Sequence, residues 1–192
     1  MPTCDLSLFA ISGSLRAASF NTMLLRAAEE LAPEGVRFDH YERLEEVPPY
    51  NQDRDQHDPP EPVTDLRRRI HEADGVLIAT PEYNYGIPGV LKNAIDWASR
   101  PPTSSALLHK HVAIMGTAAG FFGSVRAQLA LRQSFLWIDA KVMGKPEMIV
   151  PKAAERFGAD GSLTDETTEE LLRGFLLAFT DRIRADEGTS GH

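Results

Sequence analysis

The sequence predicts an α/β fold built on a single parallel sheet with helices on both faces. Five short apolar segments are typical of buried strands, segments of helical periodicity separate them, and neither an internal repeat nor a composition break indicates a second domain. This alternation is the pattern of a doubly wound, three-layer α/β/α domain. The 192 residues suffice for one such domain, 1–192, to bury a core without disulfides or a metal.

The expected strands are apolar runs that stop at turn residues or polar loops, at 6–11, 36–41, 75–79, 112–115 and 141–150. The first run, LSLFAI, ends abruptly at Ser12-Gly13-Ser14, which indicates a buried strand that enters a turn. Prolines and acids dominate 44–62, which we expect to be a long loop.

Apolar residues recur at helical spacing between the expected strands. They predict helices from Asn21 to Pro33 and over 63–73, 89–99, 124–138 and 164–184. Thr164 is the expected N-cap of the last helix, because acids follow it in the first turn. The tail from about residue 186 is expected to be disordered.

Composition and charge exclude several classes of protein. The formal net charge of −8, from 20 Lys+Arg and 28 Asp+Glu, argues against nucleic-acid binding through a basic surface. No apolar run approaches the roughly 18–20 residues of a membrane helix, and the N-terminus lacks the basic region of a signal peptide. A single cysteine, Cys4, cannot form an internal disulfide. We therefore expect a cytoplasmic protein that binds neither nucleic acid nor membrane.

The loops after the first, third and fourth expected strands have unusual sequences, at 12–21, 80–89 and 116–123. In a doubly wound sheet, ligands bind at the carboxyl ends of the strands, near the point where the strand order reverses. We therefore expect the ligand site at these three loops. No metal-binding or nucleophile motif occurs in them or elsewhere, so no metal and no catalytic side chain is predicted.

The first loop, SGSLRAASFN, has the donors that a phosphate monoester requires. Ser12, Ser14 and Ser19 supply hydroxyls, Asn21 an amide and Arg16 a positive charge, next to a helix N-terminus that already favours anions. A helix N-cap with scattered serines is the alternative, although one such residue would suffice for a cap. Neither G-x-G-x-x-G nor a Walker A motif is present, which favours a mononucleotide phosphate.

The second loop, TPEYNYGIPG, has the composition expected beside a flat ligand. Its prolines and glycines stiffen the backbone and permit close approach. Tyr83 and Tyr85 offer aromatic surface, and Asn84 with main-chain amides offers hydrogen bonds. A planar heteroaromatic ring with polar edges suits this combination, and a rigid structural turn explains the spacing equally well.

The two motifs together resemble those of the NADPH-dependent FMN reductase family. GSLRAASFN and PEYNYGIPGVLKNAIDW occur in the family's order at strand-to-helix junctions, and the similarity covers about residues 6–150. This family has a flavodoxin-like fold and includes FMN-dependent quinone, chromate and azo-dye reductases. The resemblance therefore implies FMN as the bound cofactor and a five-stranded flavodoxin-like sheet.

The resemblance also implies roles for the three loops. The first holds the FMN phosphate, PEYN lies along the isoalloxazine, and the loop after the fourth strand closes the other side of the ring. The implied cofactor-binding residues are Ser12, Ser14, Arg16, Ser19, Phe20, Asn21, Pro81, Glu82, Tyr83, Asn84, Tyr85, Gly86, Thr117, Ala118, Gly120 and Gly123. Gly123-Ser124 stands where relatives often have Gly-Gly, and Phe121-Phe122 adds bulk there, which bears on substrate range.

The implied activity is ping-pong transfer of hydride from NAD(P)H to FMN and then to a quinone or similar small acceptor, with the chemistry carried by the flavin. Three alternatives remain: an electron carrier like flavodoxin, a regulatory module without flavin, and a reductase that releases reduced FMN to a partner. The family commonly forms dimers or dimers of dimers. The segment 128–138 is apolar on more than one face, so we expect a homodimer or homotetramer.

Overall fold

The computed structural model of the chain describes residues 6–189, with side chains for residues 6–186. Its sheet is parallel throughout, with neighbouring strands in the order β2-β1-β3-β4-β5, and β6 also pairs with β4. The strands are β1 (Leu6–Ser12), β2 (Val36–His40), β3 (Gly75–Ala79), β4 (His111–Thr117), β5 (Lys141–Val142) and β6 (Met148–Val150). This is the strand order of flavodoxin-like folds, so the predicted fold class is confirmed.

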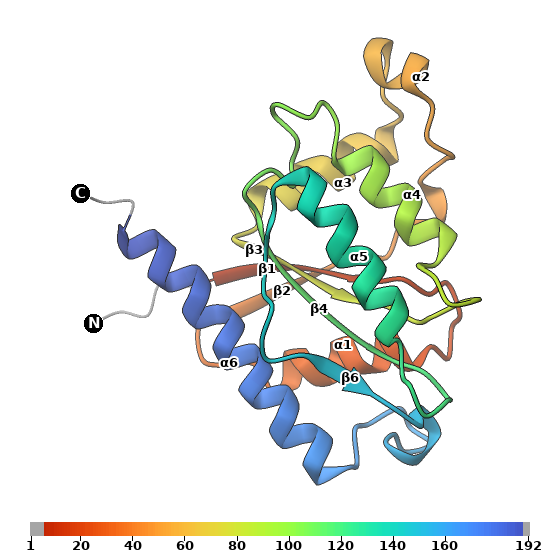
Figure 1. Cartoon of the computed structure of the whole chain (residues 1–192), viewed down its shortest axis with the longest axis vertical. Coiled ribbons are helices and arrows are strands. Elements are labelled where there is room, and N and C mark those ends of the chain that lie inside the picture. The colour runs from red at the N-terminus through yellow and green to blue at the C-terminus, as the bar shows by residue number, and fades with distance from the viewer. Residues whose placement is uncertain (1–5, 190–192) are drawn as a thin grey trace.

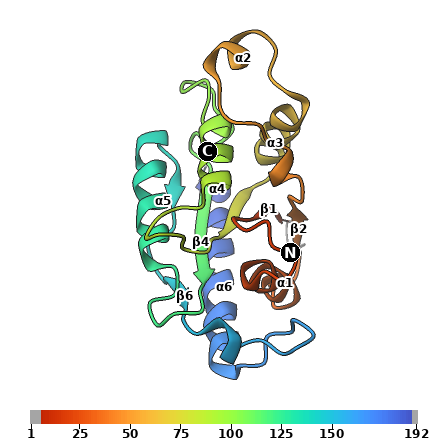
Figure 2. The ribbon, with the colours of Figure 1, turned by 90° about the vertical axis from the view of Figure 1, so that its right-hand side faces the viewer.

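Helices cover both faces of the sheet, as Figures 1 and 2 show. They are α1 (Phe20–Glu30), α2 (Gln52–His57), α3 (Glu61–Glu72), α4 (Gly89–Ala98), α5 (Val125–Ile138) and α6 (Glu166–Thr189), with short 3-10 turns at Leu44–Glu46 and Ala153–Glu155. Helices α1 and α6 pack on one face, and α3, α4 and α5 pack on the other. None of the helices described is both long and apolar enough to cross a bilayer.

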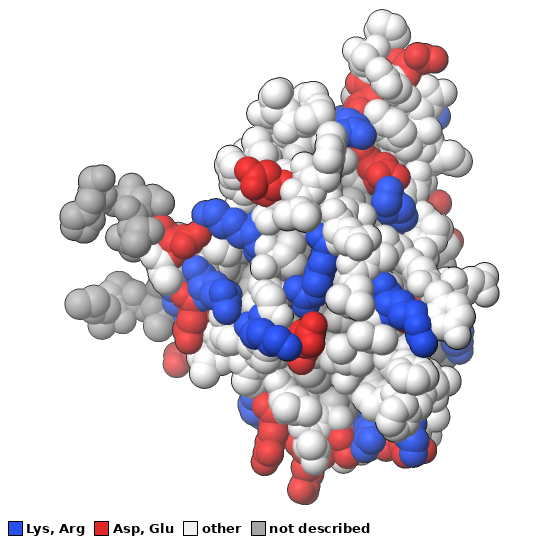
Figure 3. Space-filling view, viewed as in Figure 1, with Lys and Arg blue, Asp and Glu red and all other residues white. Residues whose placement is uncertain are grey.

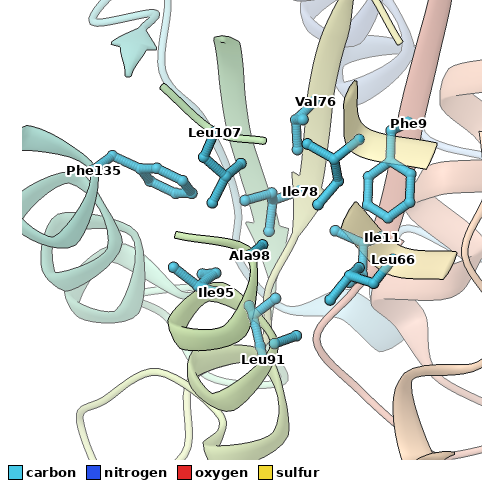
Figure 4. Close-up of a pocket in the computed structure, with 12 residues that line it drawn as sticks. Phe9, Ile11, Leu66, Val76, Ile78, Leu91, Ile95, Ala98, Leu107 and Phe135 are labelled. Atoms are coloured by element: carbon cyan, nitrogen blue, oxygen red, sulfur yellow. The ribbon is translucent and has the colours of Figure 1, made fainter. Parts of the chain in front are cut away.

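Each face of the sheet has its own hydrophobic core. Successive strand residues point to opposite faces, so β1 places Phe9 and Ile11 under α3–α5 and Leu8 and Ala10 under α1 and α6. A void of about 20 Å³ remains in the first core, with only apolar side chains around it (Figure 4). A void of that size is a packing gap and holds no ligand.

The predicted fifth strand, 141–150, is divided in two. His111 of β4 pairs with Lys141 at one end, and Met115 of β4 pairs with Met148 at the other. The intervening residues leave the sheet and include Pro146. A proline has no N–H to donate to a ladder, which explains why the pairing does not continue.

Two helix predictions need correction. The expected loop at 44–62 contains α2, a polar helix without apolar periodicity, whose N-cap Asn51 accepts a hydrogen bond from the N–H of Asp53. The last helix is capped by Asp165, which accepts from the N–H of Thr168 at 3.0 Å, whereas the Thr164 hydroxyl donates to a distant carbonyl.

Helix α6 continues to Thr189, past its predicted end at 184, so 186–189 of the expected disordered tail are helical. The rest of that tail, 190–192, and Cys4 lie outside the described residues.

Candidate functional site

The three predicted loops begin side by side at the carboxyl edge of the sheet, on the side that faces the viewer in Figure 2. Ser12 pairs with Ala79 across β1 and β3, and Ala79 pairs with Met115 across β3 and β4. The pairing of β1 with β3 continues one residue past the end of β1, where the Gly13 N–H donates to the Ala79 carbonyl at 2.8 Å. The sheet therefore brings together loops that are far apart in the sequence.

Serine hydroxyls shape the loop after β1. The Ser12 Oγ accepts from the Ser14 N–H, and the Ser14 Oγ accepts from the Arg16 N–H, both at 3.3 Å. Buried Ser19 is the N-cap of α1, where its Oγ accepts from the Thr22 N–H at 3.4 Å. The N-cap reading is thus correct for Ser19, while Ser12 and Ser14 are partly buried and have hydroxyls that can still turn toward a ligand.

Arg16 is the free positive charge of the site. Its side chain is exposed, and among the described residues its guanidinium has no hydrogen-bond or ion-pair partner. It lies in the loop that leads into the N-terminus of α1, beside a groove of about 370 Å³ that Ser12, Ser14 and Thr22 also line. A guanidinium and the positive end of a helix dipole together favour a bound anion.

Asn21 is buried, and its amide bridges α1 to the end of β4. Its Nδ2 donates to the Thr117 carbonyl and its Oδ1 accepts from the Thr117 N–H, both at 3.0 Å. The Thr117 hydroxyl donates in turn to the Val150 carbonyl at 2.8 Å. The Asn21 side chain and Thr117 therefore join the start of α1 to the end of β4 and so support the loops.

Phe20 is also part of this support. Its ring is half-buried and packs on the ring of Phe157, with the centroids 5.7 Å apart. Its main chain forms the first position of α1, directly after the loop.

The loop after β3 turns sharply through Asn84 and Tyr85. Tyr83 and Gly86 exchange two main-chain hydrogen bonds, of 3.2 and 2.9 Å, and the two residues between them have φ of 49° and 64°. This is a two-residue turn of type I′, so the expected rigid turn is present. The Tyr83 hydroxyl lies 3.4 Å from the Ser14 Oγ, which joins this loop to the loop after β1.

Glu82 points away from the exposed surface and caps α5. Its side chain is 10% exposed, and its carboxylate accepts from the N–H groups of Arg126 and Ala127 at 2.8 and 3.3 Å and from the Arg126 guanidinium at 2.9 Å. Ser124, at the N-cap position of α5, makes no capping hydrogen bond. The Glu82 side chain therefore fastens the loop after β3 to the helix that follows β4, a role that the sequence analysis missed.

Two glycines permit the tight packing of the loop after β4. A Cβ on Gly116 would overlap both the Ser124 hydroxyl and the Thr80 carbonyl. Gly123 has a φ of 57°, and a Cβ there would lie 2.7 Å from the Ile149 side chain. Gly116 lay within the predicted loop 116–123 but was not among the implied cofactor-binding residues, although a glycine that ends an apolar strand next to a glycine-rich loop signals such a role.

The loops after β3 and β4 each contain two exposed aromatic residues. Tyr83, Tyr85, Phe121 and Phe122, which we call the aromatic rim, are 48%, 71%, 75% and 59% exposed. A cluster of exposed large aromatic side chains on an otherwise ordinary surface is typical of a binding site. Ala118 and Gly120, beside the rim, leave open space, since nothing described lies within 4 Å of a Cβ built on Gly120.

The charge of the site differs from that of the whole chain. The loops 12–21, 80–89 and 116–124 contain one acid, Glu82, and one base, Arg16, and the Glu82 charge is paired with Arg126. Elsewhere acidic and basic side chains are interspersed, as Figure 3 shows for one face. The net charge of −8 is therefore not concentrated in these loops, although Glu29, Glu42 and Glu45 line the groove beside Arg16.

Comparison with known proteins gives one consistent result. The model of the NADPH-dependent FMN reductase family matches residues 6–155. An NAD(P)H-dependent FMN reductase of Pseudomonas aeruginosa is 41% identical over 184 residues, 96% of this chain and 98% of that protein. A quinone reductase of Escherichia coli is 39% identical over 93% of this chain and 96% of that protein. Among solved structures, the Paracoccus denitrificans flavoenzyme FerB, an NAD(P)H:(acceptor) oxidoreductase, matches with a TM-score of 0.86 and 39% identity, over 94% of this chain and 98% of that chain.

Proposed function

Because the chain belongs to the NADPH-dependent FMN reductase family, we propose that it is an FMN-dependent oxidoreductase that uses NAD(P)H to reduce a quinone or a similar small acceptor. One observation carries the proposal: the loop with unpaired Arg16 and the loops with the aromatic rim follow β1, β3 and β4 at one edge of the sheet, and the Tyr83 hydroxyl lies 3.4 Å from the Ser14 Oγ. FMN has one doubly charged phosphate and one flat ring system with polar edges, and this arrangement offers a partner for each.

The donors at the first loop fit the phosphate of FMN. Arg16 supplies a charge, Ser12 and Ser14 supply hydroxyls, and the main chain of 19–21 supplies the N–H groups at the start of α1. A phosphate placed there would meet no acid from the loop itself.

The other two loops fit the ring. The turn from Pro81 to Gly86 offers main-chain groups and tyrosine rings, and 118–120 offers a small-residue segment with open space around Gly120. Glu82 and Thr117 contribute by holding these loops through α5 and Asn21, with their side chains directed inward. We therefore divide the predicted set into residues that contact FMN and residues that support the loops.

When bound, FMN takes hydride from NAD(P)H and passes the electrons to the acceptor, so the protein needs no nucleophile or general base of its own. The protein binds the phosphate, orients the ring between two loops and leaves room for a second flat molecule beside the aromatic rim. Main-chain N–H groups of the two loops, fixed before the ligand arrives, stabilise negative charge at the polar edge of the ring.

The names of the relatives favour an enzyme over the alternatives. All three names, FMN reductase, quinone reductase and NAD(P)H:(acceptor) oxidoreductase, describe reductases or oxidoreductases, and the Pseudomonas aeruginosa relative and FerB are named for their use of NAD(P)H. A flavodoxin-like carrier or a module without flavin has no such support.

We also infer that the protein is a cytoplasmic homodimer or homotetramer. Helix α5 exposes Leu129, Leu136 and Trp137, which are 52%, 82% and 65% exposed, and the surface over its middle is mostly uncharged (Figure 3). Such a face is suited to burial against another copy of the chain. The single cysteine of the chain suits a reducing compartment. Light scattering on the wild type and on Leu136→Glu tests the assembly, since a charge in an apolar interface should lower the measured mass.

Stopped-flow reduction tests the enzymatic proposal. The FMN-loaded protein is mixed with NADPH or NADH while the absorbance of the flavin is followed, and a naphthoquinone is added in a second mix. We expect rapid bleaching by at least one nicotinamide and rapid recovery with the quinone. If neither NADPH nor NADH bleaches the bound flavin faster than it bleaches free FMN, the protein is not an NAD(P)H-dependent reductase.

A further inference from the structure

Arg126 joins aromatic residues of two different loops, and the proposed function does not use it. Its guanidinium carbon lies 4.1 Å from the centroid of the Tyr85 ring and 4.9 Å from that of the Phe122 ring. Both rings belong to the aromatic rim, and both are mostly exposed. Burial therefore does not hold these rings in place; the guanidinium contacts both of them, and Phe122 also meets the Phe121 ring edge-on, with the centroids 5.5 Å apart.

Tyr85 occupies a position where the backbone alone would favour glycine. It is the second central residue of the turn between Tyr83 and Gly86, with a φ of 64°, and turns of this type usually place glycine there. A tyrosine in the left-handed region costs conformational energy. Its stacking on Arg126 offsets that cost and defines the direction of the ring.

Arg126 is itself fixed. Its guanidinium donates to Glu82 Oε1 at 2.9 Å, while Oε2 accepts from main-chain N–H groups at the start of α5. The Glu82 side chain is 10% exposed and that of Arg126 is 36% exposed. The carboxylate also lies at the positive end of the α5 dipole, which stabilises it there. Glu82, Arg126 and the two rings thus form one connected unit across the loops after β3 and β4.

We propose that Arg126 is a positioning residue that holds Tyr85 and Phe122 as a stacking surface for planar aromatic acceptors. The inference rests on the proposed function, because it assumes that acceptors reach the cofactor past the aromatic rim. A flat quinone gains most from rings that are already in place, since loose rings lose conformational freedom each time a ligand binds. A compact inorganic acceptor such as ferricyanide does not stack, so its reduction is independent of the ring positions, and an assay at high ionic strength screens its attraction to the Arg126 charge.

The kinetic test compares Arg126→Gln with a matched control, Arg100→Gln. Arg100 also stacks on an exposed aromatic ring, with its guanidinium carbon 5.0 Å from the centroid of the Trp137 ring, but it follows the opposite end of α4 from the site. For Arg126→Gln we expect the KM for 1,4-naphthoquinone to rise on the order of three- to thirtyfold, the range of one cation–π contact, with little change in kcat. The KM for ferricyanide and all constants of Arg100→Gln should stay within about twofold of the wild type.

Two outcomes would overturn the proposal. An unchanged KM for naphthoquinone in Arg126→Gln would show that the rings need no support, and an equal rise for both acceptors would indicate general damage to the site. Phe122→Leu provides the same comparison if Arg126→Gln does not fold, because it removes the second ring on Arg126 and Phe122 is not among the implied cofactor-binding residues. It should likewise raise the KM for naphthoquinone and spare ferricyanide, and an unchanged KM for naphthoquinone would count against the stacking surface.

A spectroscopic readout on the FMN-free protein separates this inference from the proposed function. The chain has four tyrosines, so labelling with 3-fluorotyrosine gives a small set of fluorine resonances that Tyr85→Phe assigns. In Arg126→Gln the Tyr85 resonance should move toward that of free fluorotyrosine, while those of Tyr41 and Tyr50 stay in place. An unmoved Tyr85 resonance would refute the positioning role even in a protein that reduces quinones. A wild type that reduces no quinone would refute the proposed function and leave this measurement valid.

Discussion

Replacing Asn21 by alanine is expected to destabilise the FMN-free protein, although the sequence alone places Asn21 in a cofactor loop. The side chain is 4% exposed, and it both donates to and accepts from the main chain of Thr117 at 3.0 Å. Alanine removes both hydrogen bonds. It leaves a buried N–H and a buried carbonyl of Thr117 without these partners.

The magnitude follows from the two orphaned groups. A buried polar group that loses its partner costs about 1–3 kcal/mol, so two cost about 2–6 kcal/mol before relaxation. A water that enters the space left by the amide would recover part of this, and we expect a loss of about 2–4 kcal/mol in the free energy of unfolding. In a domain of this size each kcal/mol corresponds to about 2–4 °C, so Tm should fall by about 4–16 °C.

Urea unfolding of the FMN-free protein, followed by circular dichroism at one fixed protein concentration, measures the effect. Ser14→Ala is the matched control, because Ser14 lies in the same loop but is only partly buried and makes hydrogen bonds of 3.3 and 3.4 Å. It should change stability by no more than about 0.5 kcal/mol. Asn21→Asp should be intermediate, since it keeps an acceptor for the Thr117 N–H and loses the donor to the carbonyl.

One result would refute the reasoning. If Asn21→Ala unfolded within about 0.5 kcal/mol of the wild type and instead weakened FMN binding, the side chain would act on the ligand and the bridge to Thr117 would be unimportant.

Three further predictions concern the site and the opposite edge of the sheet. Arg16→Ala should weaken FMN binding by about 1.5–3 kcal/mol, the value of a hydrogen bond to a charged group. Quenching of flavin fluorescence measures the affinity, and an unchanged affinity would place the phosphate elsewhere. Gly116→Ala should lower Tm in the FMN-free protein, because the added Cβ would overlap the Ser124 hydroxyl, and a Tm equal to that of wild type would contradict the packing. Burial lowers the pKa of His111 and outweighs the attraction of Asp186, so the unfolded chain binds a proton first as pH falls. The free energy of unfolding should therefore decrease below about pH 6.5, the ordinary pKa of histidine. In urea titrations, His111→Asn should make this decrease with falling pH less steep. An equally steep decrease in the variant would assign the pH dependence to other groups.

The alternation of strands and helices and the places of the three loops could be predicted from the sequence because they rest on local signals. An apolar run such as LSLFAI that stops at Ser12-Gly13 marks both a strand and its end within a few residues. Parallel strands then place their carboxyl ends at one edge, whatever the details of packing. The error over 141–150 shows the limit of such signals, since apolar content could not reveal that pairing stops near Pro146.

The sequence by itself determined the fold class, the three loops and the chemical character of their side chains. Only the tertiary structure decided which of those side chains remain exposed at the carboxyl edge of the sheet and which bond inward to support the loops. Asn21 and Thr117 are 96 residues apart, and Glu82 and Arg126 are 44 residues apart, so no local pattern could reveal that each pair is bonded. An amide or carboxylate has the same donors and acceptors in either role. The partner that satisfies it is chosen when distant segments pack together, because a polar group that becomes buried must find a hydrogen bond within the protein.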